Sequence, residues 1–400
     1  MLSPEIRYSK LRWFWTIASL LLYILDIVTD VGLVLKYVWD QHFLWAVLTL
    51  VFVLVGLMAT QVFSYAWYID DMNNVFLNPG GKPIISRPLC VRLVSLHVLG
   101  MGILTRYLQL LKAGYKELWP GTSAHSKEEK TVAHHRLFCL ATDLSMLKLF
   151  EAFLESVPQL LLQIYLIFHH GECSLVQYVS MAFSFFNAAW AVVDYRRCLR
   201  RSLPSVQEMP AGLPTAVYLF YKLFTITSRI LAYALLLSLS TYTAVALAAL
   251  WLLGTLWAHL LHTNFCTHPT TEWVYRAVVG VVLIFTFFNV KGHDTRTPMS
   301  LYYLFHAAVN VAAPLLFAML WSPPLSLPAA TAAPPTTATE LWYFWVVVGF
   351  ITVGTAVGLV CLAVYYARMH PPGKCREADE VDGQGSPAVG EQRRSAFLQP

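Results

Sequence analysis

Charged residues are scarce in this 400-residue chain: Asp, Glu, Lys and Arg together make up 13% of it, against 57% hydrophobic residues. A soluble globular domain carries roughly 25% charged residues, because its surface must be hydrated. The composition therefore excludes a soluble α/β fold and favours a chain that lies mostly in lipid. The net charge of +5 excludes nothing by itself, so the positions of the charges matter more.

Motifs for catalysis and metal binding are also missing. The seven cysteines include no CxxC pair and no Cys/His cluster with zinc spacing. The chain has no P-loop, no GxSxG motif and no HExxH motif. We therefore expect no enzyme activity, no metal, no cofactor and no nucleic-acid partner.

Long apolar runs, in contrast, are abundant. Ten can be marked, at residues 11–37, 43–69, 89–111, 144–168, 174–195, 213–238, 242–262, 273–290, 299–320 and 340–366. A helix of about 20 apolar residues is long enough to cross a bilayer. The first run is longer than the apolar region of a signal peptide and contains two aspartates, which predicts a spanning helix rather than a cleaved leader. The predicted fold class is an all-α polytopic membrane protein.

The distribution of Lys and Arg assigns each connection between runs to one side of the membrane. Cytosolic connections carry an excess of Lys and Arg, and these residues gather after the second, third, fifth and eighth runs. The links 38–42, 169–173, 239–241 and 321–339 contain neither residue. The third run then enters and leaves on the cytosolic side, and we expect the same of the eighth. The pattern predicts eight transmembrane helices, two partial membrane-inserted helices and cytosolic termini.

The order of these runs divides the chain into two pseudo-symmetric halves. Each half has two crossings, a partial insertion and two further crossings. We assign residues 1–200 to an N-terminal membrane repeat and 201–369 to a C-terminal membrane repeat. Residues 370–400 are rich in charge, Gly and Pro and show no periodic apolar face, so we expect a disordered cytosolic regulatory tail.

One apolar run carries a stripe of polar side chains on a single helix face, because residues three or four apart share a face. Its members are Lys148, Glu151, Glu155, Gln159 and Gln163. A charge near the bilayer centre costs about 2.5–3.5 kcal/mol on insertion scales. The stripe should therefore face a partner charge or a wet groove rather than acyl chains. Pro158, in the same run, is expected to kink or unwind the helix.

Further charges lie inside other runs. Asp26 and Asp30 are four residues apart on the first run, so their like charges repel and each requires a cation or water. Lys148 is the expected partner. Arg229 lies in the middle of the sixth run. Two interpretations remain open for these residues: a functional polar path, or internal ion pairs that only fix helix packing.

The tail contains a protease motif. Asp379, Glu380, Val381 and Asp382 are followed by Gly383. Executioner caspases cut after the last Asp of such a tetrapeptide and favour a small residue next. Farther along, Phe397 and Leu398 form a small apolar patch, which we expect to dock on the folded part as a plug.

Several long motifs together resemble the XK-related family of membrane proteins, over about residues 8–369. They are LDIVTD (25–30), LWAVLTL (44–50), ATDLSMLKLFEAFLESVPQL (141–160), VDYRRCLR (193–200), HTNFC (262–266), FTFFNVKG (285–292) and MSLYY (299–303). The resemblance implies eight crossing and two partial helices in two halves, in agreement with the charge count.

The resemblance also implies a function. It is that of a plasma-membrane phospholipid scramblase, activated when a caspase removes the tail, here residues 383–400, and exposing phosphatidylserine on apoptotic cells. Some members need a single-span immunoglobulin-type partner subunit. Two alternatives remain: a non-transporting adaptor for other membrane or lipid-transfer proteins, and a channel or transporter.

Overall fold

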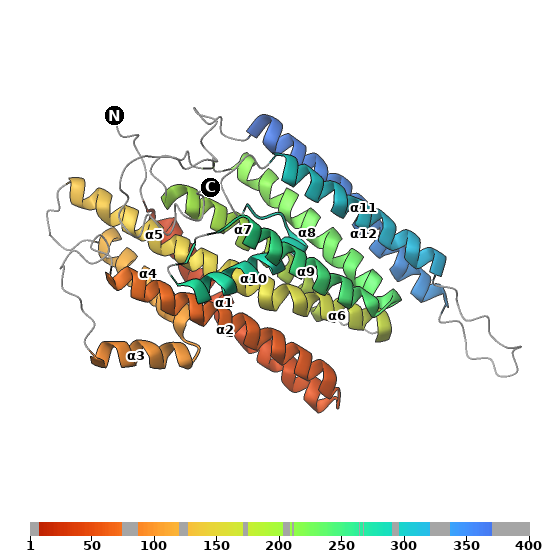
Figure 1. The fold of residues 1–400 in the computed structure, drawn as a ribbon, viewed down its shortest axis with the longest axis horizontal. Helices are drawn as coiled ribbons and strands as arrows, with labels where there is room; N and C mark the ends of the chain where they lie inside the picture. The colour runs from red at the N-terminus through yellow and green to blue at the C-terminus, as the bar shows by residue number, and fades with distance from the viewer. Residues whose placement is uncertain are drawn as a thin grey trace, which may run out of the picture.

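The computed structural model describes residues 8–73, 87–119, 127–170, 175–202, 209, 212–263, 265–266, 268–289, 296–320 and 337–369. Within these ranges the regular structure is entirely helical, which confirms the all-α prediction (Figure 1). The elements are α1 (Lys10–Trp39), α2 (Phe43–Asn73), α3 (Arg87–Val98), α4 (Gly102–Leu118), α5 (Lys127–Glu151), the π-helix η1 (Ala152–Ser156), α6 (Val157–His170), α7 (Leu175–Ser202), α8 (Leu213–Leu239), α9 (Tyr242–Leu260), α10 (Pro269–Phe285), α11 (Arg296–Leu320), α12 (Thr337–Val364) and the π-helix η2 (Tyr365–Met369).

Six helices in the described part are long and apolar enough to cross a membrane, and α3 with α4 would make a seventh if they form one bent span. The six are α1, α2, α8, α9, α11 and α12 together with η2. The multi-pass prediction is confirmed, whereas a count of eight is not established. Two expected crossings are outside the six: 144–168, which contains the polar stripe, and 174–195, which is followed directly by the Arg cluster at the end of α7.

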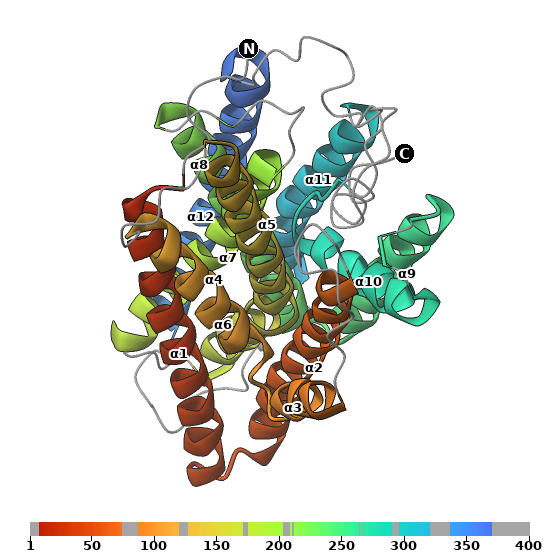
Figure 2. The same cartoon turned by 90° about the vertical axis from the view of Figure 1, so that its left-hand side faces the viewer.

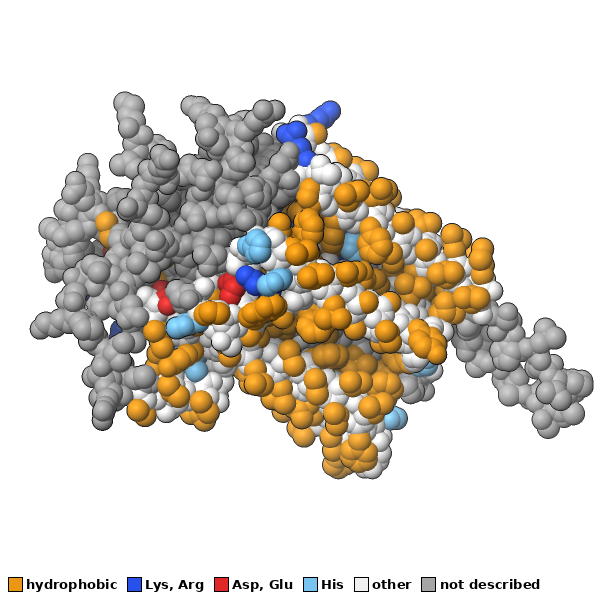
Figure 3. Space-filling view, viewed as in Figure 1, with side chains coloured by type: hydrophobic (Ala, Val, Ile, Leu, Met, Phe, Trp, Pro, Cys, Tyr) orange, Lys and Arg blue, Asp and Glu red, His pale blue; other side chains and the backbone are white. Residues whose placement is uncertain are grey.

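The long helices pack side by side, with their apolar side chains turned outward. α8 packs on α11 and α12, α5 packs on α7, and α1 packs on α2. α9 and α10 form a pair at one side of the bundle (Figure 2). Hydrophobic side chains cover the long helices toward the lower right of Figure 3, and the few charged groups in view lie toward the other end. An apolar exterior of this extent suits acyl chains rather than water.

The first expected partial insertion corresponds to α3 and α4, whose axes are bent by 118°. Gly100, at the break, has φ of 75°, which only glycine adopts readily. Backbone groups exposed at such a break need partners inside a membrane. Gln61 of α2 supplies both: its Nε2 donates to Gly100 O at 3.2 Å, and its Oε1 accepts from Gly102 N at 2.8 Å. The bend is of the kind that a re-entrant segment makes.

The second expected partial insertion corresponds to α10, a helix of 17 residues. Its last carbonyl groups have no partner within the helix, and its C-terminal end carries partial negative charge. Two buried cations of α8 cap this end. Arg229 Nη1 donates to Phe285 O at 2.6 Å, and Lys222 Nζ donates to Thr286 Oγ1 at 2.9 Å and to Phe287 O at 3.1 Å. The cap explains how these cations are held, since neither has a carboxylate ion pair within the part of the chain that the structure describes.

The helix that carries the polar stripe passes from α5 through η1 into α6. In η1, the N–H of Val157 donates to Ala152 O, five residues back. Pro158 follows directly and has no N–H to donate, so the regular ladder is interrupted at this point. The disturbance expected at Pro158 therefore takes the form of a π-helical turn, which contains Glu155.

Candidate functional site

The polar stripe faces α1 across a buried contact. Gln159 Nε2 donates to Asp30 Oδ1 at 2.7 Å, and these side chains are 6% and 8% exposed. We call Asp26, Asp30, Lys148, Glu151, Glu155, Gln159 and Gln163 the polar seam. The structure thus brings Asp30 of the first apolar run against Gln159, 129 positions later, although this partner is an amide rather than the expected cation.

The ion pair within the seam differs from the expected one. Lys148 Nζ lies 3.6 Å from Glu151 Oε2, one turn along the same helix, and 5.2 Å from the ring centre of Tyr23. Neither Asp26 nor Asp30 has a carboxylate oxygen within ion-pair distance of Lys148. The predicted Lys148–aspartate pair is therefore wrong in detail, because an (i, i+3) neighbour takes the ammonium group.

Acidic groups outnumber cations in the seam. It has the carboxyl groups of Asp26, Asp30, Glu151 and Glu155 against the single ammonium group of Lys148. Asp30 and Glu155 adjoin closely enough for a hydrogen bond when one of them carries a proton. The buried Oε1 of Gln159 has no hydrogen-bond partner in the described part. A seam that only fixed helix packing would match its charges, since unmatched buried charge is costly.

Glu155 also packs tightly against α2. A Cβ placed on Gly56 would lie 2.8 Å from both Cβ and Oε2 of Glu155. Contacts this short do not occur between carbon atoms, so only glycine admits the observed packing at residue 56. Gly32 of α1 is different, because a Cβ there would meet nothing within 4 Å.

These two glycines give a matched pair of variants. We expect Gly56→Ala to destabilise the protein by about 1–3 kcal/mol through overpacking, although Ala is otherwise the better helix former by up to about 1 kcal/mol. Gly32→Ala should be neutral or stabilising. Thermal unfolding of the purified variants in detergent measures both effects. Equal unfolding temperatures for the two variants would contradict the close contact at Gly56.

A pocket of about 120 Å³ lies at the end of the seam that includes Gln163. It is formed where the end of α1 and the start of α2 meet α6 and the start of α7. Its lining mixes polar and apolar side chains: Tyr37, His42, Trp45, Gln163, Leu166, Ile167, Gln177 and Met181. Such a mixture suits a ligand with a polar head and apolar chains.

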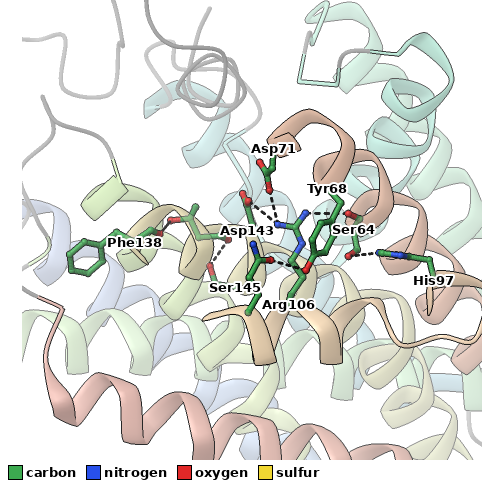
Figure 4. A network of polar contacts seen from close by, with 10 residues as sticks. Ser64, Tyr68, Asp71, His97, Arg106, Phe138, Asp143 and Ser145 are labelled. Carbon is green, nitrogen blue, oxygen red and sulfur yellow. Dashed lines mark hydrogen bonds and ion pairs between the residues drawn. The ribbon is translucent and has the colours of Figure 1, made fainter. Parts of the chain in front are cut away.

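A second buried charge cluster fixes α4 against its neighbours (Figure 4). Arg106 is 2% exposed, and its Nη1 lies 3.0 Å from Asp71 Oδ2 and 3.4 Å from Asp143 Oδ2. Its Nη2 donates to Ser64 O at 3.2 Å, and its guanidinium lies 4.2 Å from the ring centre of Tyr68. The cluster joins α4 to α2 and α5, so it fixes the position of α5, the helix that contains Lys148 and Glu151 of the seam.

This chain is similar to known proteins over most of its length. The family model described as XK-related protein matches residues 14–371. The chain is 51% identical to XK-related protein 9 of Tetraodon nigroviridis over 396 residues, covering 98% of this chain and 99% of that protein. It is 32% identical to XK-related protein 8 of Tetraodon nigroviridis, covering 93% and 86%, and 32% identical to XK-related protein 8 of Pan troglodytes, covering 91% and 85%.

The chain belongs to the XK-related family. Within this XK-related protein, Arg229 stands apart from the other residues predicted for the seam. It is 2% exposed, and its Nη1 donates to Phe285 O and, at 2.5 Å, to the hydroxyl of Tyr302. Its role in the structure is to cap α10, so the polar seam of the N-terminal half is formed without it.

Two buried cations of this XK-related protein were not predicted to have a role. The sequence patterns described above single out neither Arg106 nor Lys222. Ionisable residues inside apolar runs are themselves a signal, since they rarely face lipid. The signal could have identified both residues but not their partners, because Asp71 is 35 positions from Arg106 and Thr286 is 64 positions from Lys222. The predicted cleavage motif Asp379–Gly383 and the plug residues Phe397 and Leu398 lie outside the described residues.

Proposed function

We propose that this XK-related protein is a phospholipid scramblase that exposes phosphatidylserine on apoptotic cells after a caspase cuts its tail. The observation that carries the proposal is the polar seam. It holds more acidic groups than cations, between α1 and the continuous helix α5–η1–α6, and apolar side chains surround it. A lipid that flips alone drags its headgroup through hydrocarbon. A seam open to the bilayer would offer the headgroup polar partners while the acyl chains remain in lipid.

The chemistry of the seam suits phospholipid headgroups as a class. Choline, ethanolamine and serine headgroups all carry a cationic nitrogen, which carboxylates attract, and all carry a phosphate, which Lys148 attracts. Groups shared by these lipids would be recognised alike, so the seam favours transport with little selectivity. The pocket beside Gln163 would take a headgroup at one end of the path.

The seam is closed in the structure, and α1 closes it. Only Tyr23 and Asp30 are buried among the residues of α1, whereas Leu21, Leu25 and Val28 are 62%, 54% and 61% exposed. Asp30, Glu151 and Glu155 are each more than 90% buried. We infer that lipid transport requires α1 to separate from α5, η1 and α6, which would break the hydrogen bond between Gln159 and Asp30.

Cleavage after Asp382 would provide the trigger. The tail leaves the fold at the end of η2, and a tethered segment has an effective concentration in the millimolar range when its linker is short. Even a weak contact by Phe397 and Leu398 would then hold it in place, and cleavage would release it irreversibly. The proposal places the protein in the plasma membrane with both termini cytosolic, residues 1–200 and 201–369 as membrane repeats, and 370–400 as the regulatory tail. An executioner caspase is the activating partner, and a single-span immunoglobulin-type subunit is a further candidate partner.

Alanine variants of the two glutamates test the seam. We expect Glu151→Ala and Glu155→Ala to slow lipid flipping at least tenfold, because each removes a charged hydrogen-bonding group worth about 1.5–3 kcal/mol from the path. The measurement is the flipping of fluorescent phospholipids in liposomes that contain the purified, caspase-cut protein. Glu117→Ala is the matched control, since Glu117 of α4 is outside the seam and has no ion pair in the described part.

The same assay separates the candidate functions. A scramblase flips lipids faster after caspase treatment. An adaptor flips none in either state, and a channel conducts ions without flipping lipids. Unchanged flipping in both glutamate variants would show that the seam is not the path.

A further inference from the structure

The outward face of α4 combines lysines with large apolar and aromatic side chains. The inward face is buried against α1, α2 and α5, as shown by Ile103, Tyr107 and Leu110. The residues left exposed repeat at helical spacing and therefore form one stripe. They are Leu108, Lys112, Tyr115, Lys116 and, at the helix end, Trp119. This face is continuous with the start of α1.

Aromatic contacts join the two helices into one surface. Trp13 Nε1 donates to Leu111 O at 2.9 Å, and the Trp13 ring lies edge-on to that of Trp119 at 5.2 Å. A Cβ on Gly114 would lie 2.8 Å from Cδ1 of Trp13, so glycine permits this close approach. We call Lys10, Trp13, Lys112, Tyr115, Lys116 and Trp119 the α1–α4 platform.

The lysines of the platform are available to a ligand. Lys10, Lys112 and Lys116 are exposed, and none has a carboxylate within ion-pair distance among the described residues. Lys10 Nζ lies 5.1 Å from the ring centre of Trp119, which itself stacks on Tyr115. The platform therefore presents three ammonium groups, which have no carboxylate partner among the described residues, around a stacked aromatic cluster.

The surroundings place the platform at a membrane surface. Next to Lys10 on α1, Leu11, Phe14 and Trp15 are 67%, 56% and 67% exposed. Lysines and tryptophans beside an exposed apolar band are typical of a membrane interface, and an excess of Lys indicates its cytosolic side. A helix face of this kind binds anionic lipid surfaces through charge and apolar contact together.

We propose that the α1–α4 platform binds the headgroups of anionic phospholipids in the cytosolic leaflet. The ammonium groups would contact phosphate and carboxylate oxygens, while the aromatic rings lie among the upper acyl chains. α4 packs on α5, the helix that contains Lys148 and Glu151 of the seam. The site would thus concentrate phosphatidylserine beside the start of the path. In its role as a supply of substrate the inference rests on the proposed function, whereas binding itself does not.

Lipid association measures the site without any transport. Purified full-length protein is placed in vesicles of phosphatidylcholine that contain spin-labelled phosphatidylserine or spin-labelled phosphatidylcholine, and the motionally restricted fraction of each label is compared. We expect the native protein to prefer phosphatidylserine. The variant K10Q/K112Q/K116Q should lose at least fivefold of that preference, since each lysine near an anionic surface contributes about that factor.

Two variants serve as controls. K10R/K112R/K116R keeps the charges and should keep the preference. Lys36→Gln removes an exposed lysine from the last turn of α1, outside the platform, and should also keep it. An unchanged preference in the triple glutamine variant would overturn the proposal. Equal loss in the arginine variant or in Lys36→Gln would overturn it as well, because neither local charge nor this site would then bind the lipid.

Two further measurements are made. One distinguishes binding of a lipid from binding of a free anion, and the other distinguishes lipid binding from lipid transport. Sodium phosphate, at the same ionic strength as sodium chloride, should not displace the label more than chloride does; selective displacement would assign the site to free phosphate and overturn the lipid assignment. Flipping of fluorescent lipids is measured on the same vesicles. A native protein that prefers phosphatidylserine and flips no lipid would refute the proposed function and support the platform.

Discussion

An Asp382→Ala variant is expected to leave dying cells almost without exposed phosphatidylserine, while the protein folds and reaches the cell surface normally. Caspases require the aspartate before the cut bond, so the variant keeps its tail tethered to η2. The site lies in a segment whose composition predicts disorder, so the substitution should not affect the membrane part. Annexin staining during apoptosis, in cells that lack other scramblases, measures the result. Full staining by this variant would refute activation by cleavage at this site.

Two companion variants separate the cut from the plug. Removal of residues 383–400 should expose phosphatidylserine without any caspase, since the released segment is then absent from the start. Replacing Phe397 and Leu398 by Asp should partly activate the uncut protein, because an acidic pair does not dock on an apolar surface. If the variant with Asp at 397 and 398 is inactive while the variant lacking 383–400 is active, activation by cleavage is supported and only the role of Phe397 and Leu398 as a plug is refuted.

Arg106→Met should destabilise the protein by about 3–5 kcal/mol. The variant removes the buried cation that Asp71 and Asp143 share, and removing one partner of a buried ion pair usually costs more than the pair itself contributes. It also removes the hydrogen bond to Ser64 O that joins α4 to α2. Thermal unfolding in detergent and the fraction of protein delivered to the cell surface both report the loss.

A combined variant tests the cause of that loss. Arg106→Met with Asp71→Asn and Asp143→Asn should recover much of the stability, since the two carboxylates are then removed together with their shared cation. If the triple variant is no more stable than Arg106→Met, packing of the arginine rather than charge pairing holds α4 in place.

The sequence predicts the large features of this fold because membrane insertion depends on local composition. The apolar runs, the break in the third run and the shared face of Glu151, Glu155 and Gln159 all follow from spacing along one helix. The disturbance before Pro158 follows from the missing N–H. Each of these features depends on residues within one or two helical turns of one another, and such short spacings can be read from the sequence.

Partners across helices were harder to predict, because they depend on packing. Four carboxylates of the seam are candidate partners for Lys148, and it pairs with Glu151 because this residue is one turn away on the same helix. Arg229 was expected to belong to a polar path or to an internal ion pair, yet it donates to a backbone carbonyl of α10, and a sequence pattern does not show which carbonyl a side chain will meet. Gly56 is a similar case: its importance becomes visible only once Glu155 is seen against it.

The length of α1 has a consequence for where such a protein can work. Its 30 residues extend about 45 Å, whereas the hydrocarbon core of a bilayer is about 30 Å thick. A helix that is too long tilts, and it tilts further where the bilayer is thinner. Most side chains of α1 are exposed and Asp30 is held by Gln159, so we expect a change of tilt to strain this hydrogen bond. If the seam opens as proposed, acyl-chain length and sterol content affect the free energy of opening, and the protein should be harder to open in a thick sterol-rich membrane than in a thin one.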